Sequence, residues 1–465
     1  MTTASSATRK WRSTADWGCF FSTLVLLSCY GLWYAGVWPG PMGQDGYSLI
    51  ANINQGVPRY TGKDPAWLLY ALGTYGLSQR IEVMMLPLLL MHVAILSRII
   101  GWIYFQGHRI VAILLLVFIG CAPHILNYAT SLYPDGIFSL ALIGVLFEIW
   151  ITLRRGRLTW WSGIFIFIAF PAAALFKSNG ILLILPLAYL AFRLKGIQRW
   201  AILLTVIFWM VAVQIGGKVA DLGKGHGALQ PLVLFETVNF MQSKPMKLWE
   251  TRHMVTDKTK EIIYRHISQE DLDRLFDRDY WDTLWHQNHD VVKFRSISKQ
   301  DQRALQREFF TYNLWRNIPA FVSSRVNIFL ASAFAQGGLV GPDDAKAGLA
   351  SVQTLSTYNP FGLEAVPAFI RRAFIASYNW RFILWTPLIG ISLIFICVRK
   401  AVRQKDRDDL VVVSLLALQL VGIFIFSIAA EYRYLLMFFY APLLLLPMLF
   451  EPAVRNPGRV DSGQA

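Results

Sequence analysis

Long apolar stretches alternate with short polar segments along most of the chain. Each stretch is close to the ~20 residues that cross a bilayer core, so the pattern predicts membrane-spanning helices. They fall at about 17–38, 80–105, 109–127, 135–153, 160–177, 180–194, 200–217, 380–398, 410–430 and 433–450. We therefore predict an all-α polytopic membrane protein with about ten spans, in a range of roughly eight to eleven because two stretches are short.

The first apolar run begins at Trp17, after a polar segment that contains Arg9, Lys10 and Arg12. It is too long for the core of a signal peptide and lacks a small-residue cleavage site. We expect it to remain as the first membrane helix.

Basic residues follow every even-numbered span. They are His108 and Arg109, then Arg154, Arg155 and Arg157, then Arg193, Lys195 and Arg199, and finally Arg399, Lys400, Arg403 and Lys405. Cytoplasmic loops are enriched in Lys and Arg, so these loops and both termini are predicted to be cytoplasmic. The segments 39–79, 128–134, 177–179, 218–379 and 431–432 are then predicted to face outward.

The outward segment 218–379 is much longer than the other loops, and its polar middle, at about 243–310, is predicted to be helical and exposed to water. Ile318 to Ala335 is apolar, but a span there would place the basic residues 399–405 outside, so we predict an amphipathic helix on the membrane surface. These considerations divide the chain into an N-terminal membrane module (1–217), an outward segment (218–379) and C-terminal membrane helices with a short tail (380–465).

Composition supports a membrane protein, because 55% of the 465 residues are hydrophobic and only 16% are charged, against about a quarter charged in soluble domains. The net charge of +15 lies largely beside apolar runs, which argues against a nucleic-acid partner. The four cysteines lie within or beside apolar stretches at no zinc-site spacing, so we expect neither a disulfide nor a metal centre from them.

Two other polar clusters have the composition of binding sites. His286, Asn288, His289 and Asp290 resemble metal ligands, but no further cluster completes the set, so we interpret them as a solvated face and predict no metal site. Gly223 to Gly227 is rich in glycine but lacks the strand–loop–helix context of a phosphate loop, so we interpret it as a connector.

The outward turns carry two carboxylates beside apolar helices. Asp45 follows the first span, and Asp135 stands at the mouth of the fourth. An acid at the end of an apolar helix is costly unless it faces protein or water, which makes both residues functional candidates. The alternative for each is an ordinary helix N-cap.

Cations accompany these acids on the same predicted side of the membrane. They are Arg59, Lys63, Lys177 and Arg433, with Asp64 and Glu431 beside two of them. Singly, Lys177 can be an interfacial lysine and Glu431–Arg433 an interfacial pair. Together, a carboxylate can accept a proton from an attacking hydroxyl and the cations can hold a departing phosphate. This combination of carboxylates and cations suits the transfer of a sugar from a polyprenyl phosphate.

The chain resembles the C-type glycosyltransferase superfamily, in the branch of protein O-mannosyltransferases and lipid A aminoarabinose transferases. The resemblance is clearest from Trp38 to Ala191. It rests on Asp45-Gly46-Tyr47, Arg59-Tyr60, Lys63-Asp64-Pro65, Asp135, Lys177 to Pro186, and Arg433-Tyr434 before Ala441-Pro442. Two departures stand out: Gly46 replaces the second acid of the family's pair, and the family's acid-lysine order is reversed at Lys63-Asp64.

The resemblance implies Asp45 as the principal catalytic acid/base, Asp135 as its partner, and Lys177 and Arg433 near the lipid phosphate. Arg59, Tyr60, Lys63, Asp64 and Glu431 are further expected substrate-binding residues. The expected reaction is an inverting transfer from a polyprenyl-phosphate sugar to a glycan, lipid or protein acceptor, without a required cofactor. The expected site is the periplasmic face of a bacterial inner membrane.

Two alternatives remain from the sequence. A transporter or flippase for a lipid-linked sugar would usually show internal repeats and polar groups at mid-membrane, which we do not find. An O-antigen polymerase or ligase would share the large outer segment, but the early acidic loop argues against it.

Overall fold

A computed structural model describes residues 3–57, 63–222, 229–242, 254–285 and 292–451, with side chains from Phe20 onward. The described residues form helices joined by loops, and their one bridge between extended segments pairs Tyr280 with Ala429. The helices are apolar and long, so the chain is an α-helical, multi-pass membrane protein.

Six helical segments in the described chain are long and apolar enough to cross a membrane singly: Ile81–Phe105, Pro134–Arg155, Ile197–Val219, Arg381–Gln404, Arg407–Phe426 and Tyr432–Phe450. A seventh candidate, Arg109–Gly120 with Pro123–Ala129, is bent by 60° at its break. Shorter apolar helices occupy Phe20–Gly36, Trp160–Leu175, Ser178–Arg193 and Ile318–Ala333. The ten stretches predicted from sequence fall on the six segments, the bent pair and the first three of the short helices.

The chain folds into two compact units. The helical bundle comprises residues 1–225, 340–419 and 436–465, and the second unit comprises residues 226–339 and 420–435. These two units are defined by contacts between residues. The division predicted from the sequence was based instead on the side of the membrane. The two divisions differ mainly in residues 340–379, which fold with the bundle.

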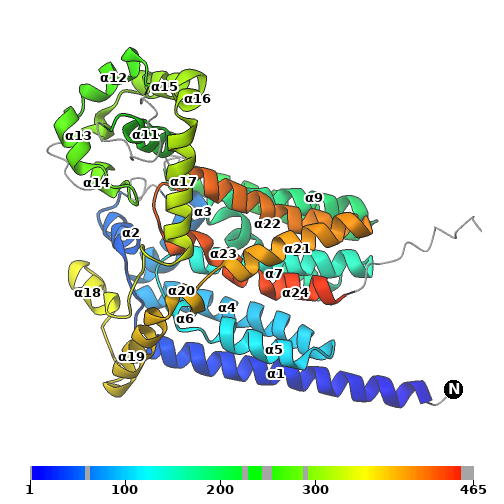
Figure 1. Ribbon diagram of the computed structural model, residues 1–465. Coiled ribbons are helices and arrows are strands. Elements are labelled where there is room, and N and C mark those ends of the chain that lie inside the picture. Colours follow the sequence, from blue (N-terminus) through cyan, green and yellow to red (C-terminus); the bar gives the residue numbers. More distant parts are fainter. Residues whose placement is uncertain (1–2, 58–62, 223–228, 243–253, 286–291, 452–465) are drawn as a thin grey trace, which may run out of the picture. The chain divides into compact units, whose positions relative to one another are not determined.

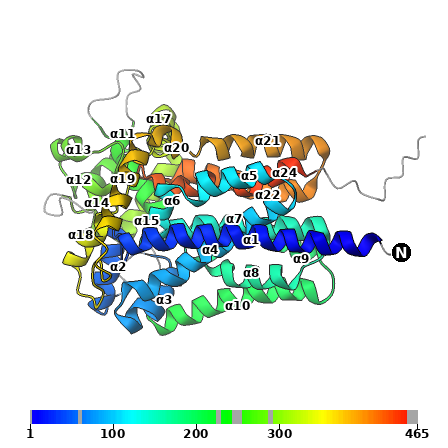
Figure 2. The ribbon, with the colours of Figure 1, turned by 90° about the horizontal axis from the view of Figure 1, so that it is seen from below.

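The bundle contains most of the long helices, which lie side by side with their axes roughly aligned (Figures 1 and 2). Its N-terminal part consists of α1 (Thr3–Gly36), α2 (Gln44–Asn54), α3 (Pro65–Ala71), η2 (Leu72–Gly76), α4 (Ile81–Phe105), α5 (Arg109–Leu115), η3 (Leu116–Gly120), α6 (Pro123–Ala129), α7 (Pro134–Arg155), α8 (Trp160–Phe170), η4 (Pro171–Leu175), η5 (Ser178–Leu183), α9 (Ile184–Arg193) and α10 (Ile197–Val219). Its C-terminal part consists of α18 (Asp344–Ser351), α19 (Ala365–Asn379), α20 (Arg381–Leu384), α21 (Leu388–Gln404), α22 (Arg407–Phe426), α23 (Leu436–Tyr440) and α24 (Pro442–Phe450).

Helix α7 is the central element of the bundle. Its residues from Pro134 to Leu153 are buried, and it contacts α4, α8, α9, α23 and α24. Pro134 occupies its first turn, where a missing N–H costs nothing. Gly156 ends it in the left-handed conformation at φ 65°, with Arg154 and Arg155 in the last turn complementing the helix dipole.

One end of the bundle is joined by ion pairs between basic and acidic loop residues. Arg154 lies 2.8 Å from Asp406 and 2.6 Å from Asp409, and Arg193 lies 3.1 Å from Asp408. These contacts connect the ends of α7 and α9 to the turn between α21 and α22. Three of the four basic loops predicted to share one side of the membrane thus meet at one end of the bundle.

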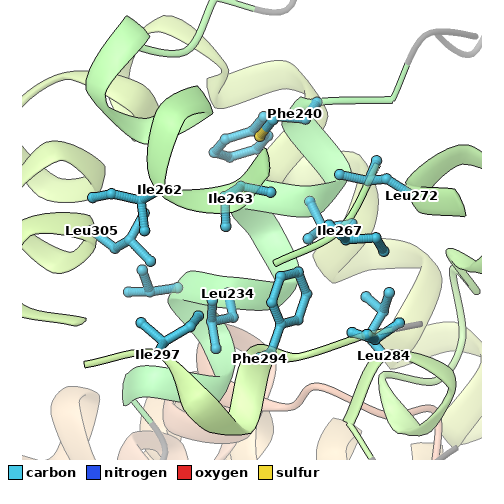
Figure 3. Close-up of a cluster of buried hydrophobic side chains, with 14 of the residues drawn as sticks. Leu234, Phe240, Ile262, Ile263, Ile267, Leu272, Leu284, Phe294, Ile297 and Leu305 are labelled. Carbon is cyan, nitrogen blue, oxygen red and sulfur yellow. The ribbon is translucent and has the colours of Figure 1, made fainter. Parts of the chain in front are cut away.

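The second unit is a smaller helical assembly, described here by itself. It consists of α11 (Leu229–Phe240), α12 (Asp257–Tyr264), α13 (Gln269–Leu275), α14 (Asp282–Trp285), η6 (Phe294–Ser296), α15 (Lys299–Glu308), η7 (Phe309–Asn313), α16 (Leu314–Arg316), α17 (Ile318–Ala333) and η8 (Tyr432–Leu435). Apolar side chains from α11, α12, α13 and α15 fill its core, including Phe240, Ile263 and Leu305 (Figure 3). The hydrophobic effect therefore holds this unit together as in a water-soluble domain.

A buried ion pair supplements this core. The guanidinium of Arg325 donates to the carboxylate of Glu236, and both side chains are fully buried. Ser324 and Asn239 also donate to Glu236, at 2.8 and 3.1 Å. Burial raises the pKa of Glu236, and the positive charge of Arg325 opposes that rise.

Candidate functional site

Glycines in the first loop of the bundle bring it against the turn before α7. A Cβ at Gly43 would fall 2.0 Å from the Tyr133 hydroxyl, and one at Gly46 would fall 2.9 Å from Cβ of Leu132. The backbone N–H of Leu132 also donates to the carbonyl of Pro41 at 3.1 Å. The close approach therefore depends on the absence of side chains at these glycines.

The position of Gly46 leaves no space for a side chain. It lies in the first turn of α2 and is buried against Leu132. An acidic side chain at this position would need the space that Leu132 occupies.

Asp45 lies in the first turn of α2, next to the loop that leads into α3. Its Oδ1 atom is 2.6 Å from Nζ of Lys63, and the two side chains are 30% and 22% exposed. The N-cap of α2 is Gly43, so the interpretation of Asp45 as an N-cap is wrong. The carboxylate remains accessible from solvent beside an ammonium group.

Asp64 follows Lys63 in the chain and precedes α3. It interacts most strongly with a different lysine, Lys177. Its carboxyl accepts a hydrogen bond from the backbone N–H of Ser178 and is attracted by Lys177 and Lys63. Burial nevertheless raises the pKa of Asp64 above its ordinary value. Asp64 thus connects the first loop to the turn before η5.

Asp135 and Lys177 form the innermost pair of this group. Asp135 lies in the first turn of α7 and is 4% exposed, and it accepts from Lys177 Nζ. Tyr133 is the N-cap of α7, so the N-cap interpretation of Asp135 is also wrong. A Cβ at Gly180 would fall 2.8 Å from the carbonyl of Ala173, so this glycine permits the tight turn that presents Lys177.

The five residues form a row of alternating charge at one end of the bundle. The order is Asp45, Lys63, Asp64, Lys177 and Asp135, from the most accessible acid to the most buried one. Such a row offers an accessible base and two ammonium groups that can hold a phosphate.

The remaining predicted site residues lie outside the described residues or in the second unit. Arg59 and Tyr60 lie outside the described residues, as do the segments 286–290 and 223–227. Glu431 and Arg433 belong to the second unit, where Nε of Arg433 is 2.5 Å from Oε2 of Glu431.

Residues 340–356 pack beside the first loop, a contact that the sequence pattern does not predict. Residues 340–356 were predicted to be part of the outward segment, but they are hydrogen-bonded to the bundle. The side chain of Asn54 donates to the carbonyl of Gln353 at 2.6 Å, and the N–H of Leu355 donates to the carbonyl of Gln79 at 2.9 Å. Ser356 donates to the buried carboxylate of Glu82 at 2.5 Å.

These contacts are mostly made by backbone carbonyls and amides. Every residue has backbone groups, so the residue pattern does not predict these contacts. Only the buried acid Glu82 at the start of α4 could have indicated that another segment packs there.

Within the described residues, no three His, Cys, Asp or Glu side chains come together as a metal ion would require. Comparison of the chain with protein-family models, with curated proteins and with solved structures finds no match.

Proposed function

We propose that the protein is a C-type glycosyltransferase that transfers a sugar, with inversion, from a polyprenyl phosphate to an acceptor. The single observation that supports it most is the accessible carboxylate of Asp45 beside Lys63, in one row with Lys177 and Asp135. We further propose ten spans, with both termini in the cytoplasm and the row of charges at the periplasmic face of a bacterial inner membrane.

We propose different roles for the two principal acids because their exposure differs. Asp45 is 30% exposed and can meet an acceptor, whereas Asp135 is 4% exposed and bound to Lys177. Asp45 is therefore the proposed base, and Asp135 positions the ammonium of Lys177.

The transfer balances without a cofactor. The acceptor hydroxyl gives its proton to Asp45 while its oxygen bonds to the anomeric carbon from the face opposite the phosphate. The bond between that carbon and the phosphate oxygen breaks, and its electron pair leaves with the polyprenyl phosphate. Lys63 and Lys177 stabilise the charge that develops on the leaving phosphate.

The donor and acceptor define two further parts of the proposal. The lipid tail of the donor reaches the site from the surrounding bilayer, and Arg59, Tyr60, Asp64, Glu431 and Arg433 remain proposed substrate-binding residues. The acceptor is a glycan, lipid or protein of the cell envelope, with lipopolysaccharide or another polysaccharide as the first choice.

The experiment compares envelope glycans by mass spectrometry from cells that carry the wild type, Asp45→Asn or no protein. The proposal predicts a sugar-sized mass increase in the wild type alone. Identical glycans in all three, with the protein expressed and the donor present, would contradict it and favour a lipid-linked sugar transporter.

A further inference from the structure

An ion pair lies inside the bundle, away from the row of charges. Nε of Arg98 in α4 is 2.8 Å from Oε1 of Glu148 in α7. Both residues lie seven positions before the C-terminal ends of their helices, at Phe105 and Arg155, or about 10 Å along each axis. The pair is therefore located near the basic end of the bundle.

Burial is unequal within this pair. The Glu148 side chain is fully buried, whereas 32% of the Arg98 side chain is exposed. Glu148 fixes the guanidinium of Arg98 but does not cover it. A partly exposed arginine in a membrane span has a high free-energy cost unless an anion or water contacts its guanidinium group.

Polar residues continue along the same stripe of α7. Glu148, Thr152 and Arg155 are spaced by four and three residues, so they share a face of the helix. The Thr152 side chain is buried, and its hydroxyl makes no hydrogen bond to any residue the structure describes.

Three helices meet along this stripe. One turn before Glu148, a Cβ at Gly144 would fall 2.8 Å from Ile95 of α4 and 3.1 Å from Phe165 of α8. Contacts of α7 with both α4 and α8 agree with this arrangement (Figure 2). The polar stripe therefore runs outward from a tightly packed junction of α4, α7 and α8.

The cluster carries an excess of positive charge. Arg155 lies within electrostatic reach of Arg98, Glu148 and Arg157. Neither Arg155 nor Arg157 forms an ion pair or hydrogen bond with another described residue. The cluster therefore contains three guanidinium groups and one carboxylate.

Two tryptophans mark the level of the lipid headgroups at this end. Trp160 and Trp161 begin α8, each is 63% exposed, and their rings lie 4.0 Å apart. Exposed tryptophans concentrate where the bilayer meets water. The basic cluster is therefore at the end of the bundle where we expect phosphate headgroups.

We propose that Arg98, Arg155 and Arg157 bind the phosphate headgroup of an anionic membrane lipid at the junction of α4, α7 and α8. Guanidinium groups bind phosphate oxygens through paired hydrogen bonds, and basic sites between membrane helices select anionic lipids. The site is at the end of the bundle remote from Asp45 and does not depend on the proposed transferase activity.

The test measures lipid binding to the purified full-length protein by native mass spectrometry. Phosphatidylglycerol is compared with phosphatidylcholine and with inorganic phosphate, for the wild type and for the double variant Arg155→Gln/Arg157→Gln. The matched control is Arg399→Gln/Arg403→Gln, which removes two exposed arginines from α21. We expect the wild type and control to prefer phosphatidylglycerol, and the Arg155/Arg157 variant to bind it roughly tenfold or more weakly.

A second variant, Arg98→Gln/Glu148→Gln, removes both charges of the ion pair and leaves no buried carboxylate without a partner. It is expected to weaken phosphatidylglycerol binding as well, with the helical content unchanged by circular dichroism. Equal binding of the two lipids by the wild type, or undiminished binding by the Arg155/Arg157 variant, would overturn the proposal. Equally tight binding of inorganic phosphate would overturn the assignment to a lipid.

Discussion

The Nζ atom of Lys63 lies 2.6 Å from Oδ1 of Asp45, while its neighbour Asp64 interacts more strongly with Lys177 than with Lys63. Two consecutive residues of one loop thus contact two different parts of the bundle. The lysine neutralises the accessible acid, and the aspartate helps to hold the lysine that Asp135 also binds. Both residues of this lysine-acid pair therefore have a structural role in the row of charges.

The pair of Lys177 and Asp135 combines a structural role with a proposed phosphate-binding role, and two variants separate them. Lys177→Met leaves the carboxylate of Asp135 buried without its ammonium partner. We expect a loss of about 3 kcal/mol in the free energy of unfolding and a loss of transfer. Asp135→Asn/Lys177→Met removes both charges and should recover most of the stability but none of the transfer.

Thermal unfolding in detergent and a transfer assay on the same preparations check this prediction. Recovery of transfer in the double variant would show that Lys177 does not hold the phosphate. Equal stability of the single and double variants would show that the ion pair is energetically unimportant.

Gly46→Ala tests whether the loop depends on close approach to Leu132. The added Cβ would fall 2.9 Å from Cβ of Leu132, an overpacked contact. Overpacking typically costs about 1–3 kcal/mol, so the apparent melting temperature should fall. The matched control is Gly73→Ala, whose Cβ meets nothing within 4 Å. A melting temperature unchanged in Gly46→Ala and lowered in Gly73→Ala would contradict the packing described for α2.

The raised pKa of Asp64 predicts a pH dependence of stability. Burial disfavours its ionised form, so the folded state holds the proton to higher pH than the unfolded state. Stability is therefore lost as pH rises above the ordinary aspartate pKa of about 4 and through the folded value. The Asp64→Asn variant lacks this loss of stability. The melting temperature of the variant relative to that of the wild type should therefore rise with pH. A difference in melting temperature between the two proteins that stays constant from acidic to neutral pH would contradict this prediction.

The sequence predicted which turns carry the site, but it did not predict which charged residues of the site form pairs. Loop charge alone grouped the turns that carry Asp45, Asp135 and Lys177, and the structure brings these three turns to one end of the bundle. Apolar length predicted the helices well because burial in lipid needs the same residues along the whole span.

The pairings depend on contacts that the residue pattern does not encode. Nothing in the order Lys63-Asp64 says that each residue contacts a different segment of the chain. The N-cap interpretation of Asp45 and Asp135 was wrong for a local reason: Gly43 and Tyr133 take the extended backbone conformation before each helix. Residues 340–356 escaped detection because backbone groups make most of their contacts with the bundle.

In the second unit, Arg325→Met should be strongly destabilising, because it leaves the carboxylate of Glu236 buried without its cation. Loss of one member of such a pair costs about 3–5 kcal/mol. The double variant Glu236→Leu/Arg325→Met replaces the pair with apolar side chains and should be markedly more stable than the single variant. Denaturant unfolding followed by circular dichroism measures both. A double variant no more stable than Arg325→Met would exclude charge burial as the cause.

The central claim is that Asp45 accepts the proton of the acceptor, and the most direct measurement is the rate of sugar transfer by purified Asp45→Asn. The matched control is Asp343→Asn, which removes an aspartate of the bundle that is likewise paired with a cation, Arg371 at 3.0 Å, but is 66% exposed. We expect Asp45→Asn to keep the wild-type melting temperature and to lose transfer by at least about a hundredfold, while Asp343→Asn transfers at the wild-type rate. Transfer by Asp45→Asn within a few-fold of the wild type would contradict the account.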